Sequence, residues 1–202
     1  MTSILLLRHG QIRANVEGRW HGSTDSPLTW RGRRQANRTG RHLAASESKP
    51  THIYSSPLER CRHTAQQIAN QLDINPEIED NLREYCIGEW EGMRFSDLAE
   101  NHNFVKRAIE DPDYAPPGGE SLAVVAQRMK AAIASIHERH DHEPDARLLV
   151  VGHGAAMAVL LGELLHSTPA RWTDYQFANC SLTELVLSPA PYVNFFNSTQ
   201  HL

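Results

Sequence analysis

The sequence has 202 residues, of which 40% are hydrophobic and 22% are charged, and its formal net charge is −4 at pH 7. A chain of this length can bury a sizeable core, so we expect one globular domain that spans residues 1–202. Basic and acidic residues are interspersed, which argues against a surface for nucleic acid or for an anionic membrane. Small molecules or other proteins are the expected partners.

The first apolar run of the sequence is short, from Ile4 to Leu7, and Arg8 ends it. Such a run is too short for the apolar segment of a secretory signal and far too short to cross a bilayer. The chain has three widely spaced cysteines: Cys61, Cys86 and Cys180. Without a Cys-x-x-Cys pair, they are typical of reduced thiols rather than of a disulfide framework or a zinc site. These observations favour a cytoplasmic protein.

Strands and helices are predicted to alternate from the N-terminus. Residues 2–8 are apolar on both faces, as expected of a strand in the middle of a parallel sheet. A stretch rich in helix formers follows and reaches about Ala45, and Thr29 is its predicted N-cap. This first pair of elements already has the strand-to-helix order of an α/β protein.

A second strand and helix repeat this order. Residues 51–55 predict a strand, and the helix that follows it reaches Leu72. Ser56 is the predicted cap of this helix, and Pro57 is predicted to lie in its first turn.

The second half of the chain continues the alternation. Ser121 is predicted to open a long amphipathic helix, 148–151 form a buried strand, and an apolar helix spans about 155–165. Two more strands are predicted at 181–187 and 192–196. This pattern predicts a three-layer α/β/α sandwich with a mostly parallel central sheet.

Polar side chains follow three of the predicted strands. Arg8 and His9 follow the first, Arg60 lies one turn into the helix after the second, and His153 follows the third. Ligands of open α/β sheets bind beyond the carboxyl ends of the strands, so these four groups should converge. Guanidinium groups hold phosphate oxygens bidentately, and a neutral imidazole can attack phosphorus. The residues therefore predict a phosphate site with a histidine nucleophile.

Six blocks of residues carry a recognisable motif. They are Arg8-His9-Gly10-Gln11 with Asn15; Asp25-Ser26-Pro27-Leu28-Thr29 with Gly32 and Gln35-Ala36; Ser55-Ser56-Pro57-Leu58-Glu59-Arg60 with Thr64-Ala65; Leu82-Arg83-Glu84 with Gly88, Trp90, Glu91 and Gly92; Pro117-Gly118-Gly119-Glu120-Ser121; and Val151-Gly152-His153-Gly154. In this order, from residue 4 to about residue 165, they resemble the histidine phosphatase superfamily, which is also called the phosphoglycerate-mutase-like family.

The resemblance implies a role for each matching residue. His9 is implied to be the nucleophile that becomes phosphorylated, and Glu84 the acid that protonates the leaving group. Arg8, Arg60 and His153 are implied to line the phosphate pocket and to offset charge on the phosphoryl oxygens. The implied fold is the phosphoglycerate-mutase-like α/β fold.

Four further positions are predicted to matter for substrate binding. The resemblance implies that Asn15 helps to hold the phosphoryl group and that Glu120 lies near the entrance of the site. His21 stands where a neutral polar residue is more usual in the family, and we predict a substrate contact. Ile12 replaces a serine or threonine of the family's signature loop, so we expect a change in affinity or in the lifetime of the phosphoenzyme.

Three functions are compatible with these residues. The first is a phosphatase that hydrolyses a small phosphomonoester through phosphohistidine, and the second is a phosphoglycerate mutase. Mutases of the family are longer, with an insertion after the proton donor and a tail that covers the pocket, whereas this chain is compact between Gly92 and Pro117. Hydrolysis is therefore the favoured prediction. The third, a phosphate-ester binding protein without turnover, is disfavoured by the presence of His9, Glu84 and His153.

No cofactor and no metal site are predicted. His137, His140 and His142 lie near Asp141 and Glu143, but we interpret them as a solvated helix end because they form no closed set of ligands. The four tryptophans are predicted to lie in the core or in the pocket wall: Trp20, Trp30, Trp90 and Trp172. The sequence leaves the oligomeric state open, and a homodimer is one of the options.

Overall fold

The computed structural model describes residues 3–187 and 190–202, so Thr2 of the predicted first strand lies outside the described residues. The strands are β1 (Ser3–Arg8), β2 (His52–Ser55), β3 (Glu77–Ile78), β4 (Leu148–Gly152), β5 (Leu182–Val186) and β6 (Tyr192–Ser198). The helices are α1 (Arg13–Glu17), α2 (Trp30–Ala45), α3 (Glu59–Leu72), α4 (Phe95–Glu100), α5 (Phe104–Glu110), α6 (Leu122–Arg139) and α7 (Gly154–His166), with short 3₁₀ helices η1 (Asp80–Leu82), η2 (Gly88–Trp90) and η3 (Pro169–Asp174).

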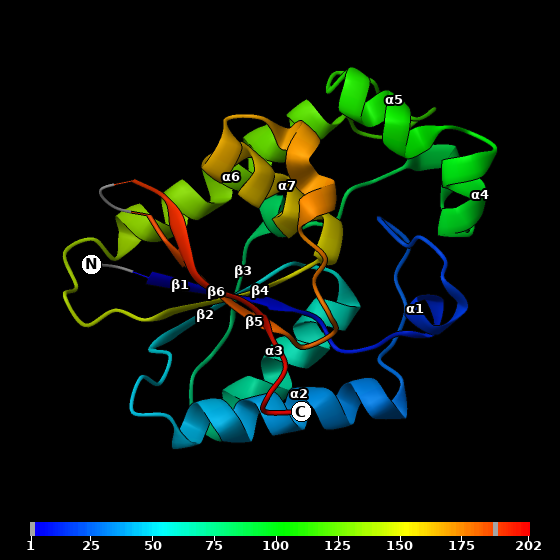
Figure 1. The fold of residues 1–202 in the computed structure, drawn as a ribbon. Helices are drawn as coiled ribbons and strands as arrows, with labels where there is room; N and C mark the ends of the chain where they lie inside the picture. Colours follow the sequence, from blue (N-terminus) through cyan, green and yellow to red (C-terminus); the bar gives the residue numbers. More distant parts are fainter. Residues whose placement is uncertain (1–2, 188–189) are drawn as a thin grey trace.

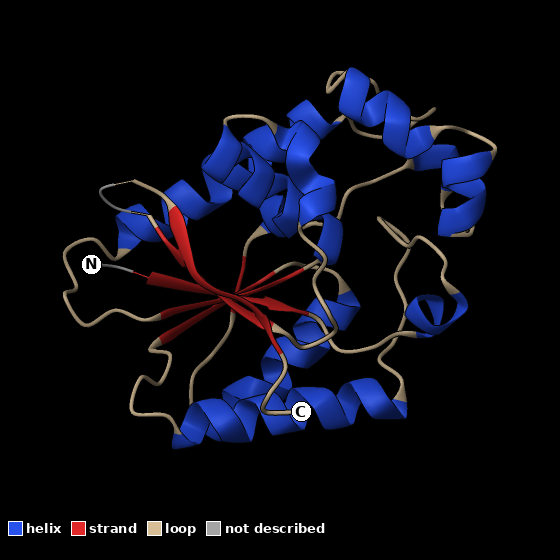
Figure 2. Ribbon diagram, viewed as in Figure 1, coloured by secondary structure: helices blue, strands red, loops and turns tan. Residues whose placement is uncertain are grey.

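The elements form three layers. Helices α2 and α3 cover one face of the sheet, and α6 and α7 cover the other (Figure 1). Figure 2 shows the same arrangement, with strands between two groups of helices. The predicted three-layer α/β fold is confirmed. Among the described residues, no helix combines the length and the apolar character needed to cross a membrane.

The sheet has six strands in the order β3-β2-β4-β1-β5-β6. The pairs among β1, β2, β3 and β4 are parallel, whereas β5 and β6 are joined antiparallel at one edge. The prediction of a mostly parallel sheet is therefore confirmed. Because β1, β2 and β4 are parallel neighbours, their carboxyl ends meet at one edge, where Arg8 pairs with Gly152 and Ser55 with Val151.

Two hydrophobic clusters hold the layers together. Successive strand residues point to opposite faces, so Leu6 packs in the cluster with α6 and α7, and Leu7 packs with α2 and α3. Both side chains are fully buried. The central strands read as continuous apolar runs because both of their faces are covered.

The predicted helix starts are confirmed at two places. The Thr29 hydroxyl accepts a hydrogen bond from the Gly32 N–H at the start of α2, and the Ser121 hydroxyl accepts one from the Val124 N–H at the start of α6.

The predicted cap of α3 is wrong. This helix begins at Glu59 and has Leu58 at its cap position, without a side-chain cap. Ser56 is buried instead, and its hydroxyl lies 2.7 Å from Nε2 of His153. The Ser-Pro pair therefore belongs to the loop that leads to the site, and not to the helix.

The segment between Gly92 and Pro117 has more structure than the sequence indicates. It contains α4 and α5, which lie at the same end of the molecule as α1 (Figure 1). These helices have only six and seven residues, too few to establish an apolar period in the sequence. They matter because they border the cavity described below.

Candidate active site

The carboxyl ends of β1 and β4 place two imidazoles side by side. The His9 N–H donates to the Gly152 carbonyl at 3.0 Å, which continues the β1–β4 ladder by one residue. The rings of His9 and His153 consequently meet edge to face, with their centroids 5.3 Å apart. Both side chains are buried, at 3% and 0% exposure.

His9 is held as a neutral imidazole with one nitrogen free. Its Nδ1 lies 2.8 Å from the Gly10 carbonyl oxygen. Because a carbonyl only accepts, Nδ1 carries the proton and Nε2 keeps its lone pair. Burial, together with the positive charges of Arg8 and Arg60, holds the pKa of His9 well below its usual value. Nε2 has no hydrogen bond within the described part of the chain, and His9 borders a cavity.

His153 is neutral as well, in the opposite tautomer. Nε of Arg60 donates to His153 Nδ1 at 3.2 Å, so Nδ1 is the acceptor and Nε2–H donates to the Ser56 hydroxyl. Burial, with Arg60 as the next cause, holds the pKa of His153 well below its usual value. The proton is therefore on Nδ1 in His9 and on Nε2 in His153, and of the two histidines His9 borders the cavity.

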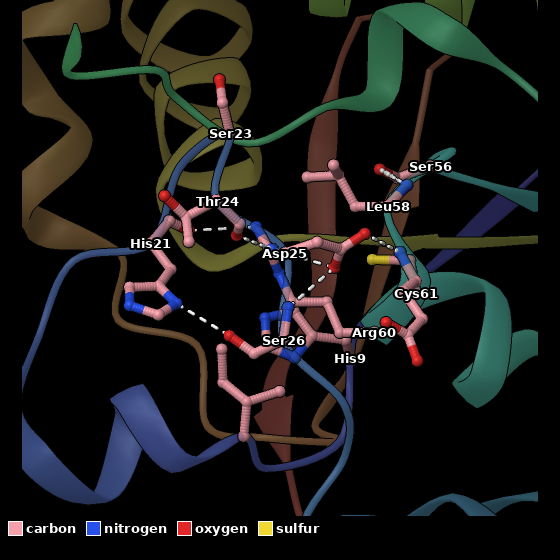
Figure 3. A network of polar contacts seen from close by, with 12 residues as sticks. His9, His21, Ser23, Thr24, Asp25, Ser26, Ser56, Leu58, Arg60 and Cys61 are labelled. Atoms are coloured by element: carbon pink, nitrogen blue, oxygen red, sulfur yellow. Dashed lines mark hydrogen bonds and ion pairs between the residues drawn. The ribbon is translucent and has the colours of Figure 1, made fainter. Parts of the chain in front are cut away.

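Arg60 lies beneath the loop of residues 21–24. Its remaining nitrogens donate to the carbonyls of Thr24, His21 and Gly22 at 2.8 to 3.0 Å. Figure 3 shows the guanidinium against the segment that continues to Ser26. The side chain is fully buried and does not line the cavity.

Glu91 holds the same loop from its other side. Its carboxylate accepts hydrogen bonds from the N–H groups of Gly22, Ser23 and Thr24 at 2.9 to 3.2 Å. The N–H groups of the loop therefore bind an anion while its carbonyls bind Arg60. This double attachment fixes the position of His21 and of the residue before it, Trp20.

Arg8 is the arginine that reaches the cavity. Its guanidinium donates to the Phe177 carbonyl. Its Nε is buried and has no partner among the described residues. Burial lowers the pKa of Arg8 from its usual value, and the charge of Glu84 opposes that shift. A buried donor without a partner is costly, so this end of the cavity favours an anion.

Glu84 is oriented by the start of α7. Its carboxylate accepts from the N–H groups of Ala155 and Ala156 at 3.1 and 2.7 Å, and from that of Tyr85 at 2.8 Å. The helix N-terminus supplies unpaired N–H groups that suit a carboxylate. Glu84 is 9% exposed and borders the same cavity as His9.

The backbone of Glu84 is held by Arg128 of α6, which the sequence analysis did not identify. Arg128 donates to the Glu84 carbonyl at 3.0 Å and to the Arg83 carbonyl at 2.6 Å. It also forms an ion pair with Glu120 at 2.7 Å. Glu120 further accepts from the Cys86 N–H at 3.0 Å and does not line the cavity.

Asn15 and His21 border the cavity beside His9. Oδ1 of Asn15 accepts from the Ile12 N–H at 3.1 Å and from the Asn179 amide at 3.0 Å, which leaves the Asn15 amide donors for a ligand. Nδ1 of His21 lies 2.8 Å from the Ser26 hydroxyl, and burial lowers the pKa of His21.

Asn179 was not found from the sequence either. Its amide also donates to the His9 carbonyl at 3.1 Å. It lies just before β5 and in no motif block, so only its position at the shared edge of the sheet could have indicated it.

The cavity has a volume of about 620 Å³ and two kinds of wall. One end is polar, with Arg8, His9, Asn15, His21 and Glu84. The rest of the lining is largely apolar and aromatic, with Trp20, Phe95, Val105, Trp172, Tyr175 and Phe177, and its polar members are Arg19, Thr173 and Gln176. Trp20 and Trp172 are thus in the pocket wall and Trp90 is in the core, as predicted. Trp30 contradicts the prediction because it is 75% exposed at the first turn of α2.

Two glycines in this region serve packing within the chain. A Cβ on Gly10 would come within 2.5 Å of the Gly32 carbonyl oxygen, so the loop after β1 can lie against α2 only without a side chain there. A Cβ on Gly154 would come within 3.2 Å of Nε of Arg8. The missing side chain therefore leaves room for the arginine beside the start of α7.

One group of residues outside the cavity has the composition of a metal site. His52, His140 and Glu143 each offer a ligand atom within 4.8 Å of the others. Both nitrogens of His140 are already engaged, with Tyr54 at 2.8 Å and with Glu143 at 3.0 Å. His140 is only 6% exposed, so the interpretation of this region as a fully solvated helix end is wrong for His140.

Comparisons with known proteins agree with the motif blocks. A family model of the histidine phosphatase superfamily (branch 1) matches residues 4–193. A probable phosphoglycerate mutase GpmB of Klebsiella pneumoniae is 33% identical over 195 residues, which cover 96% of this chain and 88% of the relative.

Solved structures of phosphatases are similar over almost the whole chain. A phosphoserine phosphatase from Entamoeba histolytica, solved with 3-phosphoglyceric acid, has a TM-score of 0.87 at 31% identity and is covered completely, as is this chain. A mycobacterial glucosyl-3-phosphoglycerate phosphatase, solved with VO3, has a TM-score of 0.87 at 28% identity, with 98% of this chain and 100% of that one covered.

Proposed function

The chain belongs to the histidine phosphatase superfamily, and we propose that it hydrolyses a small phosphomonoester through a phosphohistidine on His9. One observation carries the proposal: a neutral imidazole keeps the lone pair of Nε2 at a cavity that also exposes Arg8 and Glu84. A nucleophile, a cation for the phosphoryl oxygens and a carboxyl group for the leaving oxygen are the three groups that ester cleavage requires.

In the first step, Nε2 of His9 attacks phosphorus. The new N–P bond replaces the P–O bond to the leaving alcohol, and the departing oxygen takes the proton of the Glu84 carboxyl group. Arg8 and the Asn15 amide hold the phosphoryl oxygens. Arg60 adds positive charge from beneath the site.

In the second step, a water molecule attacks the phosphorus of phosphohistidine. The Glu84 carboxylate accepts a proton from that water, the N–P bond breaks, and inorganic phosphate leaves. His9 and protonated Glu84 are both regenerated, so the cycle needs no cofactor. His153 keeps its neutral tautomer throughout and supports His9 from the side. We also propose that His21, which borders the cavity, contacts the substrate.

A mutase is the second candidate, and one comparison favours it. Several relatives at 31–34% identity carry the name probable phosphoglycerate mutase. A mutase returns the phosphoryl group to a reoriented substrate instead of to water. The similar solved phosphatases support hydrolysis.

We retain the expectation of one cytoplasmic domain, with a homodimer as one option.

The experiment that separates these functions measures two products in parallel. Phosphate release is followed over a panel of phosphorylated metabolites, while isomerisation of 3-phosphoglycerate is followed without net phosphate release. We expect phosphate release, and a brief pulse with a labelled ester should leave acid-labile, base-stable label on His9. Isomerisation alone would identify a mutase, and ester binding without either product would identify a binding protein.

A further inference from the structure

The cavity is much larger than a phosphoryl group. Cavities of about 300–1,000 Å³ accommodate whole drug-sized ligands, and this one measures about 620 Å³. The phosphoryl group is assigned to the polar end by Arg8, His9 and Glu84. The rest of the volume therefore belongs to the alcohol part of the ester.

The wall that faces the alcohol is built around Trp20. Its ring stacks on Phe95 at a centroid distance of 5.9 Å and an angle of 18°, and it meets Trp172 edge to face at 6.2 Å. Its indole N–H is satisfied by the Tyr85 carbonyl at 3.0 Å. Since the polar atom of the ring is already bonded within the chain, Trp20 offers the ligand an apolar surface.

Two more residues extend this surface towards His9. Phe177 is 4% exposed and follows η3, and Ile12 is 1% exposed and packs with Ala14 and Leu28. Both border the cavity. A serine or threonine at position 12, which the motif resemblance leads one to expect, would have supplied a hydroxyl there. The chain has an apolar side chain instead.

The cations around the cavity are nearly all committed. The lining residues, all of which the structure describes, include no lysine, and their arginines are Arg8 and Arg19. Arg19 is bound to Glu17 at 3.2 Å and to the Gly92 carbonyl at 2.7 Å. Arg8 serves the phosphoryl group. A second anionic group on the substrate, such as a carboxylate, consequently meets a lining that is mostly aromatic and whose one further cation, among the lining residues, is Arg19, already paired with Glu17.

We infer that the preferred substrates are phosphomonoesters whose alcohol carries a planar apolar group, which lies against Trp20, Phe95 and Trp172. This inference rests on the proposed function for the phosphoryl end of the site. It excludes small phosphorylated carboxylic acids, such as 3-phosphoglycerate and phosphoserine, from the preferred class. Burial of an aromatic ring against these side chains is the source of the selectivity.

A binding experiment tests the inference without turnover. Phosphonates keep the anionic end but have no ester bond to break. Titration calorimetry should give benzylphosphonate an affinity about 10-fold or more above that of methylphosphonate, because even one methylene in an apolar pocket is worth roughly 10-fold or more. Equal affinities for the two phosphonates would overturn the inference.

Phe95 offers a variant with a matched control. Phe95 and Phe195 have similar exposures of 42% and 39%, but Phe195 lies on β6, away from the cavity. We expect Phe95→Ala to reduce the preference for benzylphosphonate several-fold and Phe195→Ala to leave it unchanged. Unchanged preference in Phe95→Ala, or an equal loss in both variants, would contradict the assignment of the wall.

The same variants separate this inference from the proposed function. The value of kcat/KM for benzyl phosphate, which has an alkoxide leaving group like that of 3-phosphoglycerate, should exceed the value for 3-phosphoglycerate by about 10-fold or more. Phe95→Ala should reduce this ratio. If every ester is hydrolysed at a similar kcat/KM, the substrate class is wrong while hydrolysis stands. If benzylphosphonate binds selectively but no ester is hydrolysed, the proposed function is wrong while the apolar subsite stands.

Discussion

The two ends of the cavity are built from different parts of the fold. The polar end, here called the floor, centres on Arg8 and His9 at the end of β1 and on Glu84, whose carboxylate is held by the N–H groups at the start of α7. The aromatic end, here called the wall, comes mostly from connections and short helices, such as Trp20 between α1 and α2 and Trp172 in η3. The nucleophile is therefore fixed by the sheet and the acid by the start of a helix, whereas the selectivity depends on less regular segments.

The largest expected effect comes from removing the nucleophile of the floor. His9→Ala should reduce phosphate release by about 10⁴-fold or more, because the variant cannot form phosphohistidine. Pulse labelling should give no acid-labile phosphate on the variant. His142→Ala, at an exposed position, is the control. Normal phosphatase activity in His9→Ala would show that the covalent route is wrong.

The next largest effect should distinguish alkyl phosphates from aryl phosphates by their leaving groups. Glu84→Gln keeps the shape of the side chain but cannot supply a proton, so alkyl phosphates should be hydrolysed about 10²–10⁴-fold more slowly. Aryl phosphates should be affected far less, because a phenolate leaves without protonation. Steady-state rates on matched alkyl and aryl esters measure the difference. Equal slowing of both esters would refute the role of Glu84 as the acid.

A smaller effect is expected when Glu84 is kept but the side chain that holds its backbone is removed. Arg128→Leu removes the donors to the carbonyls of residues 83 and 84 and should lower kcat by up to about 10²-fold, with alkyl esters affected more than aryl esters. Arg128→Lys should recover part of the loss. Arg139→Leu, also on α6 but pairing with exposed Glu77, is the control. A loss that is the same for both ester types would indicate damage to the fold alone.

The smallest effect concerns stability and not turnover. The folded-state pKa of His9 and that of His153 lie well below the ordinary value of 6.5, so below that pH the unfolded chain binds more protons than the folded one. Above pH 6.5 both histidines are neutral in the folded and in the unfolded chain, so they do not lower the free energy of unfolding. That free energy falls as the pH drops from 6.5 towards the folded-state pKa values. The slope is about 1.4 kcal/mol per pH unit for each histidine.

Urea denaturation between pH 5 and pH 8 measures this slope. His9→Asn should reduce the dependence on pH below 6.5, whereas the exposed His142→Asn should not. A slope that is unchanged in His9→Asn would show that His9 does not resist protonation in the folded state.

The floor was largely predictable from the sequence, and the reason is topological. Arg8, His9 and His153 lie at the ends of two buried apolar strands, and parallel strands end at one edge. Arg8 and His9 line the cavity there, whereas His153 packs against His9 and does not line it. Arg60 was placed near the same edge, but the sequence could not indicate that its guanidinium binds the carbonyls of the loop of residues 21–24 and does not line the cavity. Backbone acceptors have no residue type, so their positions depend on tertiary structure.

The wall was much less predictable. Trp20 and Trp172 were expected in either the core or the pocket, whereas Phe95 and Phe177 were not identified at all. Phe95 lies at the start of a six-residue helix, and Phe177 follows a 3₁₀ helix. Neither segment is long enough to show a hydrophobic period in the sequence. The prediction that Ser56 caps α3 failed for a related reason. Its hydroxyl is hydrogen-bonded to His153, 97 positions away, and not to the start of α3.

The attachment of Glu91 to residues 22–24 has a consequence for engineering. Trp20 belongs to the wall, but the N–H groups that follow it bind Glu91 and the carbonyls bind Arg60. Arg60 in turn donates a hydrogen bond to His153. A transplant of this connection from another member of the superfamily must therefore bring its own acidic anchor. An exchange confined to α4 leaves those shared peptide groups in place, and it is the safer route to redesigned selectivity.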